Sequence, residues 1–257
     1  MLKTIILIAG FAIFYGLEKL RPFFPHPRND WIRVLRNIGL SLANALLGRL
    51  IFSGETLWAI EGLNFGLLDQ LVLDAWVKFF AGFLLLDLWT YWWHRFNHTI
   101  PILWRFHAVH HSDEEMDAST ALRFHPVEIV LSSLARIPLF ALLGIDFWTL
   151  ATYEAVLAAS TLFQHANIAL PSVWDRRLSW VIVTPTMHKV HHSREEPDHE
   201  SNFTSIFSWW DRMFLTWKFE EHPETLELGL AQALPSQKKG LVALLAAPFR
   251  PTSSARN

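Results

Sequence analysis

Five apolar segments dominate this chain, and each is close to the length of a helix that crosses the hydrocarbon core of a bilayer. They cover residues 1–17, 34–52, 75–93, 127–144 and 146–163 of a chain of 257 residues. The composition agrees, because 51% of the residues are hydrophobic and only 18% are charged, which is unusual for a soluble domain. The segments predict a single domain, residues 1–257, with an all-α fold: an integral membrane bundle of about four to five membrane helices.

Charges in the connecting segments indicate the orientation of this bundle. Residues 18–36 carry Lys19, Arg21, Arg28, Arg33 and Arg36, whereas residues 53–74 contain acidic residues and no Lys or Arg. Positively charged loops stay in the cytoplasm, so the third segment is expected to end at the cytoplasmic face. Residues from about 164 onward mix polar and apolar types with several prolines. They predict a cytoplasmic helical cap on the same domain.

The last two apolar segments are joined by the short turn Gly144-Ile145-Asp146 and are expected to form a hairpin. Arg136 falls near the middle of the first of them, where a charge is costly in lipid. Two interpretations follow: the hairpin dips into the membrane without crossing it, or Arg136 faces the interior of the protein.

Eight of the thirteen histidines fall into three sets with helical spacing, and a ninth lies upstream of the last set. The sets are His94 and His98; His107, His110 and His111; and His188, His191 and His192; the ninth is His165. Residues three and four apart share a helix face, and neutral imidazole is the usual side-chain ligand for Fe, Cu, Ni or Zn. Eight or nine imidazoles exceed the needs of one ion. The pattern therefore predicts two metal ions where the membrane helices end.

Other polar residues near these sets have competing interpretations. Asp87 and Tyr91 share a helix face with His94, so Asp87 can hold the outer ring nitrogen of a ligand or simply contact another helix. His125 precedes a helix that Pro126 is suited to begin. It can be a ligand, an orienter of a ligand, or only the residue before that helix.

The remaining histidines have simpler interpretations. His26 and His222 are expected to be ordinary interfacial or core residues. His199 lies in the charged loop EEPDHESNF and is expected to be solvated.

Several classes of function are excluded or disfavoured. The chain has no cysteine, which excludes thiolate and iron–sulfur sites, and its net charge of -2 disfavours binding to nucleic acid. A zinc-dependent membrane hydrolase is one alternative, but HRFNH at 94–98 lacks the glutamate of HExxH. A metal transporter or sensor is another, but it needs polar ligands at mid-depth in the membrane.

In chain order, the motifs HRFNH, HAVHH, RFHPVE, QHAN, HKVHH and WWDRMF resemble those of the fatty acid hydroxylase and sterol desaturase superfamily, which are integral-membrane di-iron enzymes. The resemblance covers about residues 85–217. It implies an O2-dependent monooxygenase that hydroxylates, or else desaturates, a lipid or sterol-like substrate. It also implies two iron ions on the cytoplasmic side, held by the eight histidines of the three sets, with His165 as a ninth ligand. Trp210 and Asp211 match the WD element of the family, whereas Leu215 stands where a glycine is common.

The resemblance and the spacing together give candidates for side chains that support the ligands: Asp87, Tyr91, His125, Glu128, Asn167 and Asp211. The chain has neither a GxGxxG motif nor cysteines for an iron–sulfur cluster. We therefore expect electrons from NAD(P)H to arrive through a separate reductase and a small electron-transfer protein. The sequence specifies neither the lipid, nor the oxidised carbon, nor an oligomeric state.

Overall fold

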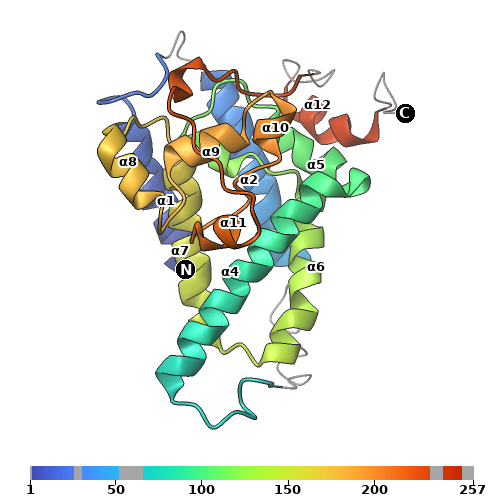
Figure 1. Ribbon diagram of the computed structural model, residues 1–257. Helices are drawn as coiled ribbons and strands as arrows, with labels where there is room; N and C mark the ends of the chain where they lie inside the picture. Colours follow the sequence, from blue (N-terminus) through green and yellow to red (C-terminus); the bar gives the residue numbers. More distant parts are fainter. Residues whose placement is uncertain (1, 26–30, 52–65, 232–239, 251–257) are drawn as a thin grey trace.

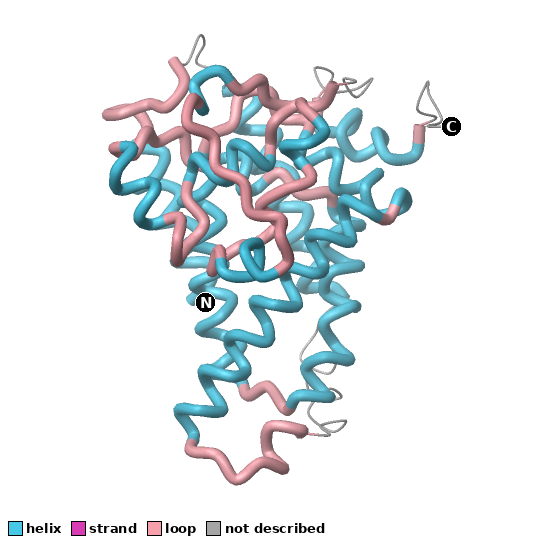
Figure 2. The backbone as a smooth tube through the Cα atoms, in the orientation of Figure 1, coloured by secondary structure: helices cyan, strands magenta, loops and turns pink. Residues whose placement is uncertain are grey.

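The computed structural model describes residues 2–25, 31–51, 66–231 and 240–250. Within these residues the fold is all-helical and no strand is formed, as the sequence predicts (Figure 2). The five long helices are α1 (Leu2–Leu17), α2 (Trp31–Ile51), α4 (Ala75–Thr99), α6 (Pro126–Leu143) and α7 (Phe147–His165). Each coincides with one of the expected apolar segments, although α4 continues six residues past the end expected at 93.

Short helices connect and cover these five. They are α5 (Pro101–His111), α8 (Ser172–Leu178), α9 (Pro185–His191), α10 (Glu196–His199), α11 (Trp209–Met213) and α12 (Leu241–Ala246), with 3-10 turns η1 (Ala118–Leu122), η2 (Pro223–Thr225) and η3 (Ala247–Phe249). Helices α4, α6 and α7 reach the narrow end of the molecule, and the short helices gather at the broad opposite end (Figure 1). Helix α1 packs on α7, α4 packs on α5 and α7, and α9 packs on α7.

Local chemistry explains where the helices that matter here begin and end. Pro101 starts α5 immediately after α4, because proline is tolerated in the first turn of a helix. Gly144 ends α6 with φ +73, a left-handed conformation that glycine adopts without steric cost. Asp146 then caps α7 by accepting hydrogen bonds from the Trp148 and Thr149 amides. The expected α6–α7 hairpin is therefore present.

Arg136 faces the protein interior, as the second interpretation of the hairpin requires. Its guanidinium on α6 pairs with Glu154 on α7, and the two side chains are 19% and 17% exposed. The pairing removes the cost of an isolated charge on an apolar helix.

One described helix, Pro126–Leu143, is long and apolar enough to cross a membrane by length and composition, and Ile5–Leu17 is a shorter apolar helix. The expected number of four to five membrane helices therefore stays a prediction. The same holds for the cytoplasmic cap, since part of the two loops used to orient the chain lies outside the described residues.

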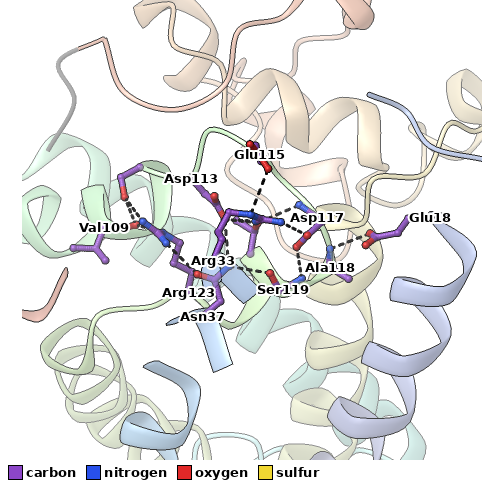
Figure 3. A network of polar contacts seen from close by, with 12 residues as sticks. Glu18, Arg33, Asn37, Val109, Asp113, Glu115, Asp117, Ala118, Ser119 and Arg123 are labelled. Carbon is purple, nitrogen blue, oxygen red and sulfur yellow. Dashed lines mark hydrogen bonds and ion pairs between the residues drawn. The ribbon is translucent and has the colours of Figure 1, made fainter. Parts of the chain in front are cut away.

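A buried polar network fastens α2 to the segment that follows α5 (Figure 3). The guanidinium of Arg33 on α2 donates to Asp113 at 2.9 Å and also to Asp117. Arg123 donates through Nε to the carbonyl of Val109, inside α5, at 2.9 Å. Burial alone would raise the pKa of Asp113, but the Arg33 and Arg123 guanidiniums outweigh it and lower that pKa. The network therefore consists of charged groups that neutralise one another, and it holds the end of α5 in place.

Two non-glycine residues near α11 adopt left-handed backbone conformations, Asn202 with φ +54 and Leu215 with φ +58. Asn202 is suited to this conformation, and its amide donates to the carbonyls of Met187 and Lys218. Leu215 has no such compensation: its side chain is 91% exposed, and the conformation costs an L-residue roughly 1–2 kcal/mol. The turn after the WD element thus keeps the backbone conformation that favours glycine even though leucine occupies it.

Candidate metal centre

The C-terminal turns of four helices, α4, α5, α7 and α9, meet at one place. His94 and His98 lie at the end of α4, His165 is the last residue of α7, and the two triplets end α5 and α9, with His192 as the residue that caps α9. Eight of the nine histidines are buried and His94 is half-buried. The carbonyl end of a helix carries partial negative charge, so four such ends create a favourable environment for cations.

The nine predicted histidines separate into two groups. One contains His94, His98, His107, His111 and His191, and the other contains His110, His165, His188 and His192. Within each group, one nitrogen from every ring lies within 4.8 Å of the others. Residues up to 97 positions apart in sequence thus form two adjacent sites of five and four imidazoles.

Within the five-histidine group, the ring nitrogens point at one another. His94 Nε2 lies 3.1 Å from Nε2 of His107 and 3.0 Å from Nε2 of His191. The opposite nitrogen of each ring faces an oxygen at 2.7 Å: Phe203 O for His94, Glu128 Oε1 for His107 and Ser201 O for His191. Each Nδ1 therefore donates a proton, which leaves a lone pair on every Nε2.

The four-histidine group shares this arrangement in part, because only His165 has an oxygen facing Nδ1, whereas Nδ1 of His110 and of His188 has no hydrogen-bond partner among the described residues. His165 Nε2 lies 3.1 Å from His110 Nε2 and 3.0 Å from His188 Nε2, while its Nδ1 donates to the Thr161 carbonyl at 2.7 Å. In the five-histidine group, where Nδ1 of His94, His107 and His191 faces an oxygen, the Nε2 lone pairs cannot hydrogen-bond to one another. Two nitrogens each about 2.1 Å from one metal ion, at right angles around it, would be about 3 Å apart. The observed spacing therefore fits one ion in each group.

The other rings also suit a metal. Among the described residues, neither ring nitrogen of His98 or His192 has a hydrogen-bond partner, and neither does Nε2 of His111. Buried polar atoms without partners cost roughly 1–3 kcal/mol each. Burial first, and neighbouring imidazoles second, lower the pKa of His111, His188 and His192 well below the usual value. The rings are thus neutral at neutral pH, the form that binds metal.

Glu128 and Asp211 support ligand rings in two different ways. Glu128 contacts His107 directly, which is the carboxylate–histidine arrangement common around bound metals. Asp211 acts one step further away. Its carboxylate accepts from the amides of Phe203 and Thr204, and Phe203 supplies the carbonyl that faces His94.

Asp87 and Tyr91 have their hydrogen-bond partners away from the histidine rings, and of the two interpretations of Asp87 the contact with another helix is the one observed. Asp87 accepts from the Trp210 indole at 2.8 Å and from the Phe207 amide at 3.2 Å, so it fastens α11 to α4. The Tyr91 hydroxyl lies 3.1 Å from Thr216 Oγ1. Both residues share a helix face with His94, as helical spacing predicts. In the turns of α4 before His94, however, α11 and the segment after it cover that face.

His125 and Asn167 also have structural partners. His125 caps α6, with Nδ1 accepting from the Val127 amide and Nε2 facing the Leu245 carbonyl at 3.1 Å. Of its three interpretations, the residue before the helix is therefore the one observed. Asn167 exchanges two hydrogen bonds of 2.9 Å with the backbone of Phe24, which ties the segment after α7 to the segment after α1.

His199 and Glu200 are near the centre and were not expected there. The His199 side chain is 13% exposed, so the expectation of a solvated residue was wrong. Its ring stacks on Trp104 with a centroid distance of 5.7 Å and an interplanar angle of 8°. Because a loop separates α9 from α10, helical spacing could not predict that His199 lies near the centre. His222 is exposed, and His26 lies outside the described residues.

Replacing Glu128 is expected to weaken metal binding at the five-histidine group. Glu128→Ala removes the acceptor that orients His107, and loss of such a partner costs about 10–100-fold in metal affinity. Glu128→Gln, which keeps an oxygen but loses the charge, should have a smaller effect. Competition with a chelator measures both, and Glu224→Gln, an exposed carboxylate, is the control. An unchanged competition curve for Glu128→Ala would show that this carboxylate does not orient a ligand.

Comparisons with known proteins agree with the motifs. Residues 79–216 match the family model described as fatty acid hydroxylase. Relatives include the ornithine lipid hydroxylase OlsE of Rhizobium tropici, 29% identical over 68% of this chain and 52% of the relative. Another is the alkylglycerol monooxygenase of Danio rerio, 33% identical over 75% of this chain and 42% of the relative. The sphingolipid C4-hydroxylase SUR2 of Saccharomyces cerevisiae is 30% identical over 54% and 40%.

The chain spans about half, or less, of the length of these curated relatives. No solved structure matches it. The family match nevertheless extends over more than half of the chain and includes all nine clustered histidines, which confirms the resemblance inferred from the motifs. The chain belongs to the fatty acid hydroxylase family.

Proposed function

We propose that this protein uses O2 to oxidise a C–H bond of a membrane lipid, hydroxylation being the first expectation and desaturation the alternative. The observation that carries the proposal is the separation of nine histidines, eight of them buried, into groups of five and four in which one nitrogen of each ring lies close to the others. The three relatives named above are hydroxylases or monooxygenases whose names specify an ornithine lipid, an alkylglycerol and a sphingolipid. All three names specify a lipid, but each specifies a lipid of a different chemical type.

Iron fits this site because the donors are all imidazole nitrogens, which suit first-row transition metals, and because there are enough of them for two ions. When bound, two irons would supply the activation of O2 and the removal of hydrogen from an unactivated carbon. The protein's own contribution is to hold nine rings and to keep the site dry by burial. It also fixes the tautomers of four rings through the oxygens that face Nδ1: His94, His107, His165 and His191.

Apolar side chains on the surfaces of the long helices support a membrane location. Ile8 on α1, Leu42 on α2, Trp76 on α4 and Trp148 on α7 are each more than 60% exposed. Large exposed apolar surfaces mark contact with lipid or with a partner. We infer that these helices lie in the bilayer, with the histidine centre on the cytoplasmic side as the Lys and Arg content of residues 18–36 suggests.

The lipid is expected to reach the centre from the membrane side. A cleft of about 460 Å³ at the broad end is lined by residues that include Glu114, Glu115 and Glu227, and by none of the nine histidines. Because none of the proposed ligands lines that cleft, a lipid held in it would not be in contact with the metal centre. Electrons are expected from NAD(P)H through a separate reductase and carrier.

Profiling lipids under 18O2 tests the proposed function. Cells that express the protein should accumulate a lipid carrying one 18O atom in a new hydroxyl group, which is absent from cells with an empty vector. A new double bond without 18O would keep lipid oxidation but reject hydroxylation. Unchanged lipids in membranes supplied with reductase and NADPH would contradict the proposal.

A further inference from the structure

Three side chains of metal-binding types form a further cluster, the outer set, at the edge of the five-histidine group. His98, His199 and Glu200 each place one ligand atom within 4.8 Å of the others. Glu200 Oε1 lies 3.4 Å from His199 Nε2 and 3.8 Å from His98 Nδ1. His98 also belongs to the five-histidine group, so this ring is shared by the two sets.

The three side chains form a gradient from solvent to the interior. Glu200 is 46% exposed, His199 is 13% exposed, and the His98 side chain is fully buried. Neither nitrogen of His98 has a hydrogen-bond partner among the described residues. A cation that approaches from water therefore meets the carboxylate of Glu200 first, then the half-buried imidazole of His199, and last the buried ring of His98, whose nitrogens accept no hydrogen bond from the described residues.

The segment that carries His199 and Glu200 is held in place. The ring of His199 is stacked on Trp104 of α5. Asp198 pairs with Lys218, and its carbonyl accepts from the Ser201 hydroxyl. Because Ser201 also supplies the carbonyl that faces His191, the outer set and the five-histidine group share one rigid support.

We propose that His199 and Glu200, together with His98, form an exposed site that takes up a divalent transition-metal ion from solvent and passes it to the five-histidine group. The inference rests on the proposed metal centre. Transfer inward is favourable because the outer set has three donors, two of them accessible to water, whereas the inner group has five imidazoles. A carboxylate at an entrance concentrates cations and raises association rates by about 10–10³-fold, and Glu200 is the carboxylate of this set.

The rate of metal uptake tests this inference. Purified full-length protein in detergent is stripped with a chelator and mixed with Co²⁺, whose visible absorption follows binding, and the final cobalt content per chain is measured separately. The variants are Glu200→Gln and His199→Gln. Their matched controls are Glu195→Gln, which removes a charge from the same loop, and His222→Gln, which removes an exposed imidazole.

We expect Glu200→Gln and His199→Gln to take up cobalt at least about tenfold more slowly than the wild type, with a final content still at two ions per chain. The two controls should load at the wild-type rate. Wild-type uptake rates in both variants would overturn the entry site while leaving the metal centre intact. A final content of one ion in Glu200→Gln would also overturn it, because Glu200 would then be a permanent ligand. A wild-type protein that binds no cobalt would contradict both the entry site and the proposed centre.

Discussion

Replacing His110 or His191 with alanine is expected to abolish oxygen-dependent product formation. The two residues lie in different groups, His191 among the five histidines and His110 among the four. Each change removes one inward-facing ring from its group, so each variant should also hold metal more weakly at that group and retain fewer than two ions per chain. Because a catalytic metal contributes several kcal/mol of transition-state stabilisation, we expect turnover to fall by about a thousandfold or more.

The control for these variants is His222→Ala, which removes an exposed imidazole outside both groups. It should keep the wild-type metal content and turnover. Product formation is measured in membranes with reductase present, and thermal unfolding confirms that each variant is folded. If His110→Ala or His191→Ala retained wild-type turnover, the residue concerned would not be a ligand.

Arg33→Met is expected to destabilise the protein strongly, because it removes a buried charge that pairs with two buried carboxylates. The substitution leaves Asp113 and Asp117, both buried, without their shared guanidinium (Figure 3). Removing one partner of a buried ion pair costs about 3–5 kcal/mol. Asp113 comes two residues after His111, so the loss should also loosen the end of α5 and weaken metal retention.

Thermal unfolding in detergent measures this effect, and two further variants identify its cause. Arg176→Met removes an exposed ion pair to Glu221, with side chains 62% and 69% exposed, and should change the free energy of unfolding by about 1 kcal/mol or less. Adding Asp113→Asn and Asp117→Asn to Arg33→Met should recover part of the lost stability, because the buried charges are then gone. Stability of Arg33→Met equal to that of Arg176→Met would show that the network does not support the fold.

Helical spacing predicted the ligand faces well because it describes one helix at a time. His107, His110 and His111 share the end of α5 as expected. The two metal ions inferred from the number of imidazoles stay a prediction, which the two groups of histidines support. Spacing could not show which of these rings join which group, since His110 and His111 are adjacent in sequence yet belong to different groups. That assignment depends on how α4, α5, α7 and α9 pack together.

The side chains around the ligands were harder to predict, because their roles depend on contacts from distant segments. Asp87 lies two helical turns before His94, but its carboxylate accepts a hydrogen bond from the indole of Trp210 on α11. His125 stands before a proline, which is enough to explain its role as a helix cap. His199 ends α10, after a break that separates α10 from α9, and its ring contacts Trp104 and His98 at the centre.

The apolar segments predicted the five long helices. The mean hydropathy of a whole helix, however, does not by itself show which of these helices lie in the membrane. Polar residues on α2 and α4 lower the average apolar character of those helices, yet many of these residues are turned inward. Arg33 and Asn37 on α2 belong to the buried network, and Asp87 on α4 is bonded to α11. The outward faces keep large apolar side chains such as Leu42 and Trp76, which an average over the whole helix conceals.

Metal analysis of the purified wild-type protein tests the central claim most directly. Two groups of inward-facing imidazoles predict about two iron ions per chain after expression in iron-sufficient cells, and both ions should be lost, together with activity, on treatment with an iron chelator. A single zinc ion per chain, with activity unchanged after iron chelation, would contradict the account.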